Sequence, residues 1–261
     1  MFGIMKKRRR RRLMETPLSP ERIAILERNV PYWRLLPEAD RRELGGLAQI
    51  FLAEKSFEGC DGLEITDEIR LTIAAHACIL LLHRATDVYP FLVSILVYPR
   101  AFVAPLREHG PDGVVIEEDE ERDGESWDTG ALILSWEDCV ESVASPRDGY
   151  NVMIHEFAHQ LDDEAGIADG VPRLDDKALA AEWTRAFERE FEALGKRADK
   201  RIPTLLDWYG SESPAEFFAV LTETFFEKPA ALKARHPELY GLIARFYRQD
   251  PAALEAAASG R

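Results

Sequence analysis

The chain has 261 residues, 46% of them apolar and 10% aromatic, and a formal net charge of −14. This composition supports a sizeable core and excludes an intrinsically disordered chain, while the acidic balance disfavours direct binding to nucleic acid, which needs a basic surface. No stretch reaches the roughly 18 apolar residues of a membrane span, so we expect no transmembrane segment. Cys60, Cys78 and Cys139 are odd in number and form no CxxC pair. We therefore expect neither a disulfide framework nor cysteine-bound zinc, and we expect a cytoplasmic location.

The first residues, MFGIMKKRRRRRLMETPLSP, contain seven consecutive basic residues from Lys6 to Arg12. No apolar segment follows them, which excludes an ordinary secretory signal. Because a run of like charges repels itself, we predict a disordered basic leader over residues 1–18, with contact to acidic lipid or nucleic acid as the alternative. The remainder, residues 19–261, contains no long linker and is predicted to form a single domain.

Helical signals dominate the next part of the chain. Ser19 and Pro20 are typical of a helix start, and residues 37–55 carry apolar side chains at helical spacing. Residues 66–84 are apolar on most sides and are predicted to form a buried helix. That helix carries His76 and His83, which we interpret as core or boundary histidines because no second ligand lies at a suitable spacing in the sequence.

The middle of the chain is predicted to form strands, at residues 91–99, 113–119 and 131–136. From residue 148 onward the pattern is helical again. Helices, a small sheet and further helices predict an α+β domain that is mostly helical with a small mixed sheet. Residues 131–136 are our candidate for an edge strand that lines a cleft and pairs with an extended substrate; the alternative is an interior strand, which has the same sequence pattern.

The motif HEFAH, which begins at His155, lies on a helix predicted to start within residues 145–148 and to stop at Gly166. His155 and His159 are one helical turn apart, so both imidazoles can bind one metal ion. Glu156 is rotated by about 100° from His155 and could take a proton from a metal-bound water without being a ligand. The alternative interpretation is an ordinary helix that contains two histidines.

A catalytic zinc ion takes three protein ligands, so a third must be found. The metzincin pattern requires glycine at position 162 and histidine at position 165, where this chain has Asp162 and Ala165, and that class is excluded. Glu216 lies at the start of an amphipathic helix within residues 207–229. The sequence SPAE is also typical of a capping box, in which the Glu216 carboxylate would accept from backbone N–H groups instead. The residues alone leave both interpretations open. The further candidates are Glu223, Glu212, Asp207 and His236, the last weakened by the proline that follows it.

Several segments resemble one known family. HEFAHQLDDEAG, DWYGSESPAEFFAVLTETFF, ILVYPRAFV, GALILSWEDC and the closing FYRQDP are similar to the Mlc titration factor A (MtfA) family of bacterial zinc peptidases. The resemblance covers residues 20–252 and leaves the basic leader outside. It implies a zincin-like metalloprotease fold of the gluzincin type, related to the catalytic domain of anthrax lethal factor, with HExxH on the active-site helix.

The resemblance also implies roles for residues of this chain. One Zn²⁺ would be bound by His155, His159 and Glu216, with Glu156 as the general base and Tyr209 as a donor to the oxyanion. The implied activity is that of a peptidase, aminopeptidase-like on short peptide substrates, with binding to the glucose-system repressor Mlc as a second property. The competing interpretation is a non-catalytic, repressor-titrating protein with a structural zinc site. Three ligands beside an intact base favour the catalytic interpretation.

Overall fold

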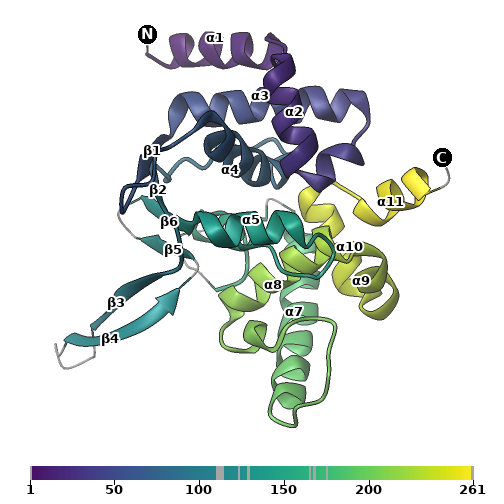
Figure 1. Ribbon diagram of the computed structural model, residues 1–261. Coiled ribbons are helices and arrows are strands. Elements are labelled where there is room, and N and C mark those ends of the chain that lie inside the picture. The colour runs from purple at the N-terminus through teal and green to yellow at the C-terminus, as the bar shows by residue number, and fades with distance from the viewer. Residues whose placement is uncertain are drawn as a thin grey trace.

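The computed structural model describes residues 2–109, 115–122, 124–127, 130–164, 166, 169–174 and 176–259. Within these residues the chain is mostly helical, with a four-stranded sheet and a separate two-stranded ribbon (Figure 1). The α-helices are α1 (Phe2–Glu15), α2 (Pro20–Asn29), α3 (Glu38–Glu54), α4 (Asp67–Ile79), α5 (Trp136–Ala144), α6 (Val152–Asp163), α7 (Lys177–Ala198), α8 (Pro214–Glu227), α9 (Pro229–Arg235), α10 (Pro237–Tyr247) and α11 (Pro251–Ser259). Two short 3-10 helices are η1 (Pro31–Arg34) and η2 (Trp208–Ser211). The strands are β1 (Ser56–Gly59), β2 (Ser94–Tyr98), β3 (Phe102–His109), β4 (Val115–Arg122), β5 (Gly124–Trp127) and β6 (Ala131–Ser135).

The sheet has the strand order β1-β2-β6-β5. Its first three strands are parallel and β5 runs antiparallel to β6, so the sheet is small and mixed, as predicted. The strand expected at 131–136 is β6, but the prediction that it is an edge strand is wrong. β6 pairs with β2 on one side and with β5 on the other, a neighbour that the sequence pattern did not reveal. The strand expected at 113–119 is β4, which pairs with β3; residues 113 and 114 lie outside the described residues.

The predicted helices of the first third of the chain are present. Ser19 caps α2, because its Oγ accepts a hydrogen bond from the backbone N–H of Arg22. His76 is 2% exposed and its Nδ1 lies 2.9 Å from the carbonyl oxygen of Thr72, which confirms it as a core histidine. His83 lies just beyond α4 at the surface, where the fold brings carboxylates of α3 to both of its ring nitrogens.

Residues 2–15, which we expected to be disordered, form helix α1 against α3. The guanidinium of Arg10 donates two hydrogen bonds to the Glu54 carboxylate, at 2.7 and 2.6 Å, and also lies 2.5 Å from Asp87. Leu13 packs against the hydrophobic core. The repulsion along the basic run is offset in part, because distant parts of the chain supply carboxylates to Lys6 and Arg10, and no local pattern shows those contacts.

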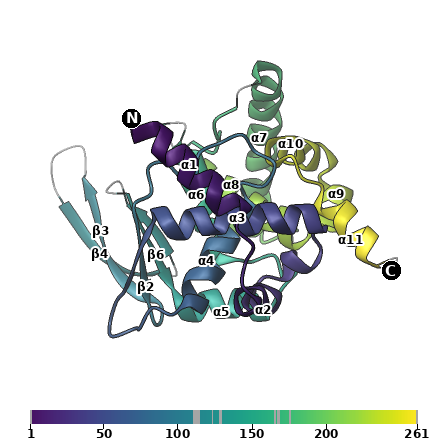
Figure 2. The same cartoon turned by 90° about the horizontal axis from the view of Figure 1, so that it is seen from above.

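One side of helix α6 packs against the hydrophobic core. Phe157 of α6 packs edge-on against Phe51 of α3, with ring centroids 5.6 Å apart, and against Tyr89 at 5.1 Å. All three side chains are almost fully buried. Seen from above, α1 and α3 cover this core, and α7 projects on the opposite side of the molecule (Figures 1 and 2). Among the described residues, no helix has the length and apolar character needed to cross a membrane.

Candidate metal centre

Helix α6 carries the HEFAH residues and starts later than the sequence predicted. Its N-cap is Asn151, whose Oδ1 accepts from the backbone N–H of Ile154 at 3.2 Å. The predicted start at 145–148 is wrong because Arg147 and Gly149 have positive φ angles, of 75° and 94°, which a right-handed helix does not contain. The cap therefore fixes the residue at which α6 begins and, with it, the turns of the helix that carry His155 and His159.

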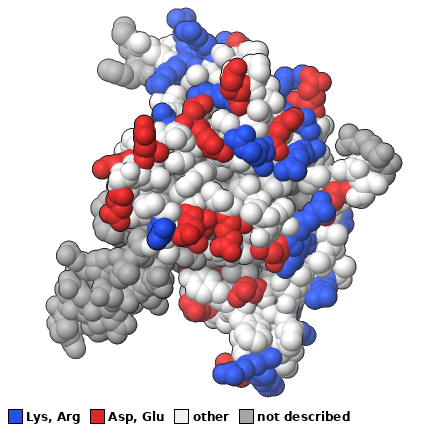
Figure 3. Space-filling view, in the orientation of Figure 1, with Lys and Arg blue, Asp and Glu red and all other residues white. Residues whose placement is uncertain are grey.

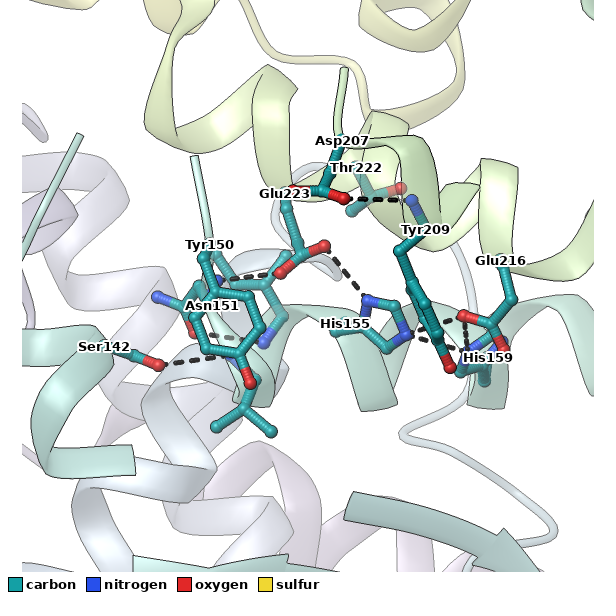
Figure 4. Close-up of polar contacts among 12 residues, drawn as sticks. Ser142, Tyr150, Asn151, His155, His159, Asp207, Tyr209, Glu216, Thr222 and Glu223 are labelled. Atoms are coloured by element: carbon teal, nitrogen blue, oxygen red, sulfur yellow. Dashed lines mark hydrogen bonds and ion pairs between the residues drawn. The ribbon is translucent and has the colours of Figure 1, made fainter. Parts of the chain in front are cut away.

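Three side-chain atoms converge where α6 faces α8 (Figure 4). His155 Nε2 lies 2.9 Å from Glu216 Oε2 and 3.2 Å from His159 Nε2, and His159 Nε2 lies 3.4 Å from the same Glu216 oxygen. Ligands held about 2.0–2.1 Å from a tetrahedral zinc ion are about 3.3 Å from one another. The three atoms therefore form a triangle of the size that one such ion requires, and these residues could hold a metal ion.

The polarity of these contacts requires a positive charge at His155. His155 Nδ1 lies 3.0 Å from a Glu223 carboxylate oxygen, which can only accept when ionised, so Nδ1 carries the ring proton. In a neutral ring, Nε2 then directs its lone pair toward the Glu216 carboxylate, and two acceptors at 2.9 Å repel each other. Burial alone would lower the pKa of His155, yet the Glu223 and Glu216 carboxylates outweigh it and raise the pKa well above its ordinary value. A cation or a proton is needed between these atoms.

Of the two interpretations of the SPAE sequence, the expectation that the Glu216 carboxylate caps backbone N–H groups is wrong, and only the serine half of the capping box is present. Ser213 Oγ accepts from the Glu216 backbone N–H at 3.1 Å and caps α8. The Glu216 carboxylate is directed at His155 and His159 (Figure 4). Burial alone would raise the pKa of this carboxyl, and the hydrogen bonds from the two histidines outweigh burial and lower the pKa well below its ordinary value. The backbone of Glu216 therefore serves the cap while its side chain joins the cluster.

Glu223, one of the alternative third ligands, lies behind His155. Its Oε2 faces His155 Nδ1, and its Oε1 accepts from the backbone N–H of Asn151 at 2.8 Å. Only 2% of Glu223 is exposed. One carboxylate thus orients the first histidine ring and also holds the start of α6. The seven-residue spacing from Glu216 on one face of α8 pointed to Glu223 in the sequence, but not to this role.

Glu156 follows His155 on α6 and is 6% exposed. Burial raises the pKa of its carboxyl above the ordinary value, and the neighbouring histidines His155 and His159 offset this only in part. A carboxylate with a raised pKa is better matched to exchanging protons near neutral pH. Its burial therefore suits proton transfer next to the three converging atoms.

Tyr209 lies on η2, where the carboxylate of Asp207 accepts from its backbone N–H at 2.9 Å. Its ring centroid is 5.9 Å from that of His155, and the side chain extends past His155 toward Glu216 and His159 (Figure 4). Tyr209 is 47% exposed, so it stands where the cluster meets solvent.

Three other sequence candidates stay outside the cluster within the part of the chain that the structure describes. Asp207 is exposed and caps η2. Glu212 is also exposed, at the end of η2. His236 joins α9 to α10, and its Nδ1 lies 3.0 Å from a carboxylate oxygen of Glu190.

Comparison with known proteins gives one consistent result. The family model described as glucose-regulated metallo-peptidase M90 matches residues 4–248. Mlc titration factor A of Pectobacterium atrosepticum is 32% identical over 86% of this chain and 85% of its own length. The protein of the same name from Escherichia coli O7:K1 is 31% identical over 85% of this chain and 84% of its own. An uncharacterized protein of Synechocystis sp. is 42% identical over 93% of this chain and 89% of its own. The matches confirm the resemblance seen in the sequence. The expectation that the basic leader lies outside the family region is wrong, because the family model begins inside α1 and includes most of the basic helix.

Proposed function

Because the chain belongs to the glucose-regulated metallo-peptidase family M90, we propose that it is a zinc-dependent peptidase of the gluzincin type, with a zincin-like fold. His155, His159 and Glu216 bind the ion. The observation that carries the proposal is the triangle of their ligand atoms, with edges of 2.9, 3.2 and 3.4 Å. Two imidazoles and one carboxylate are ligands that suit zinc and leave a fourth position for a water molecule.

Glu156 and Tyr209 supply the acid–base and electrostatic groups. Zinc, when bound, polarises a carbonyl group and lowers the pKa of a bound water to roughly 7. Glu156 accepts a proton from the water molecule that attacks the peptide carbonyl carbon, and it returns this proton to the amine as the C–N bond breaks. Its burial supports this role, because burial raises the pKa of its carboxyl. Tyr209 donates from its hydroxyl to the oxygen on which negative charge develops.

The sheet offers a place for an extended substrate beside α6. Strand β5 (Gly124–Trp127) is the last strand of the sheet order and contacts α6. A peptide can add to such an edge through main-chain hydrogen bonds. The sequence assigned this role to residues 131–136. Because β6 is paired on both sides, we assign the role to β5 instead.

The substrates are short peptides cleaved in an aminopeptidase-like manner, and Mlc or an equivalent repressor is a partner. The repressor is supported by the name Mlc titration factor A that two of the relatives carry. The rival function is a repressor-titrating protein with a structural zinc site. Structural zinc is usually closed by four protein ligands, whereas this cluster unites three beside a buried carboxyl group.

Zinc content and hydrolysis of aminoacyl and short peptide substrates, measured together, test the proposal. Chelator-free wild-type protein should hold one zinc ion per chain and hydrolyse some of these substrates. Glu216→Ala should lose most of the zinc and the activity, while Glu212→Ala, which removes an exposed glutamate four residues earlier, should keep both. Full zinc in Glu216→Ala would refute the ligand assignment. Zinc without hydrolysis in the wild type would favour the titrating protein.

A further inference from the structure

One side of α1 is anchored to the body of the protein through charge. Arg10 pairs with Glu54 and Asp87, and Lys6 lies 3.6 Å from Glu54. Arg9 donates to the carbonyl oxygen of Ala53 at 2.9 Å. These contacts use only part of the basic run, so the remaining cations need a separate explanation.

Much of the exposed surface of α1 is basic, and the carboxylate of α1, that of Glu15, lies one turn from Arg11. Lys7, Arg8, Arg11 and Arg12 are exposed, and among the described residues no carboxylate lies within ion-pair distance of any of them. Like charges one turn apart destabilise a helix. Four such cations on one helix therefore lower its stability. An anionic partner that binds them would remove this repulsion.

Two exposed apolar side chains lie on the side of α1 that carries Arg8 and Arg12, which we call its outward side. Ile4 is 63% exposed and Met5 is 65% exposed. Ile4, Arg8 and Arg12 are spaced by four residues each and so follow one line along the helix surface. Apolar side chains add nothing to contacts with phosphate groups alone, but they can enter the boundary between lipid headgroups and acyl chains.

The position of α1 lets a flat surface reach it. α1 packs on α3, α3 on α4, and α4 on α6, so α1 is the outermost layer of this stack. Figures 1 and 2 show α1 as the outermost helix on its side of the molecule. Figure 3 shows Lys and Arg gathered there, while the rest of the visible face is mostly uncharged, with acidic and basic side chains mixed.

We propose that the outward face of α1, formed by Ile4, Met5, Arg8, Arg11 and Arg12, docks the protein onto membranes that contain anionic phospholipids. The arginines meet the negative headgroups, and the two apolar side chains insert beside them. Charge complementarity and the exposed apolar pair together favour a lipid surface over nucleic acid. The proposal does not depend on peptidase activity.

Sedimentation of the full-length protein with vesicles tests the docking surface. We expect binding to vesicles of phosphatidylcholine with 30% phosphatidylserine in about 0.1 M salt, weak binding to phosphatidylcholine alone, and release at high salt. Each basic residue near such a surface strengthens binding about fivefold. The variant Arg8→Glu/Arg11→Glu/Arg12→Glu should therefore bind at least about 100-fold more weakly. Ile4→Ser/Met5→Ser should lose about tenfold, since part of the apolar contribution is removed.

The matched control reverses three exposed basic residues in the last turn of α7 and just beyond it. Arg197→Glu/Lys200→Glu/Arg201→Glu changes the net charge by the same amount, and it should bind within a few-fold of the wild type. Equal losses in both triple variants would overturn the proposal, because net charge alone would then explain binding. Failure of the wild type to bind anionic vesicles would overturn it as well. Binding to duplex DNA or RNA through the same arginines, with no vesicle binding, would assign the surface to nucleic acid instead.

Discussion

The candidate metal centre between α6 and α8 and the basic helix α1 both contain many charged groups. In the metal centre most of these groups are buried and in contact with one another, whereas on α1 most are exposed. In the centre, His155 and Glu223 are buried, and Glu216 meets both histidines of the facing helix. On α1, as far as the described residues show, only Lys6 and Arg10 meet carboxylates, and the other cations reach solvent or, for one arginine, a backbone carbonyl.

This difference predicts where a single substitution has a large effect on stability or activity. A buried charge depends on its partner, because water cannot replace a lost contact there. An exposed charge interacts with water and salt in any case, so each exposed contact contributes little. We expect single changes to be severe in the metal centre and slight on α1, where only combined changes should have a large effect.

The largest effect is expected for Glu156→Gln. Glutamine keeps the size of the side chain but cannot accept a proton, so turnover should fall about 10²–10⁴-fold while zinc content stays unchanged. Peptide hydrolysis and zinc content measured on the same preparation check this. Wild-type turnover in this variant would disprove the general-base role of Glu156.

Tyr209→Phe should have the next largest effect. The loss of one hydrogen-bond donor to the developing oxyanion typically costs about 100-fold or more in kcat. KM should change little, because the aromatic ring remains in place. Steady-state kinetics separate the two parameters. A change confined to KM would indicate that Tyr209 only packs against the substrate.

Glu223→Gln should weaken zinc binding about 10–100-fold. The carboxylate serves both the His155 ring and the Asn151 backbone N–H, whereas the amide has a single acceptor oxygen, so one donor loses its partner. Competition with a zinc chelator measures the change. Glu227→Gln is the matched control, since Glu227 lies on the same helix and contacts Arg147 and Asn151, but has no contact to His155 among the described residues. Equal losses in both variants would argue against a specific role for Glu223.

The smallest effect is expected for Arg10→Ala, on the other side of the comparison. Loss of the contacts to Glu54 and Asp87 should lower the free energy that holds α1 in place by roughly 1 kcal/mol, so amide hydrogen exchange in α1 should accelerate several-fold. Arg8→Ala, which removes an exposed cation and with it some repulsion between like charges, should not accelerate exchange. The same exchange rates in wild type and Arg10→Ala would show that apolar packing, and not this ion pair, holds the helix.

The parts of the fold that could be predicted depend on neighbours in sequence. Ser19 caps α2 and residues 91–99 contain β2 because capping and β-branched runs act over a few residues. The pairing of β6 with β5 could not be predicted, since an interior strand and an edge strand of this length have similar sequences. The state of α1 also could not be predicted, because Arg10 binds Glu54, 44 residues away.

For the metal centre, the sequence by itself determined the pair His155 and His159 and the adjacent Glu156, because helical geometry places residues four apart on one face. It also supplied Ser213 as the cap of α8. Only the tertiary structure decided that the Glu216 carboxylate turns toward the histidines and that Glu223 lies behind the first ring. Those choices depend on how α6 packs against α8, and the angle between two helices is a property of the whole core that no local pattern records.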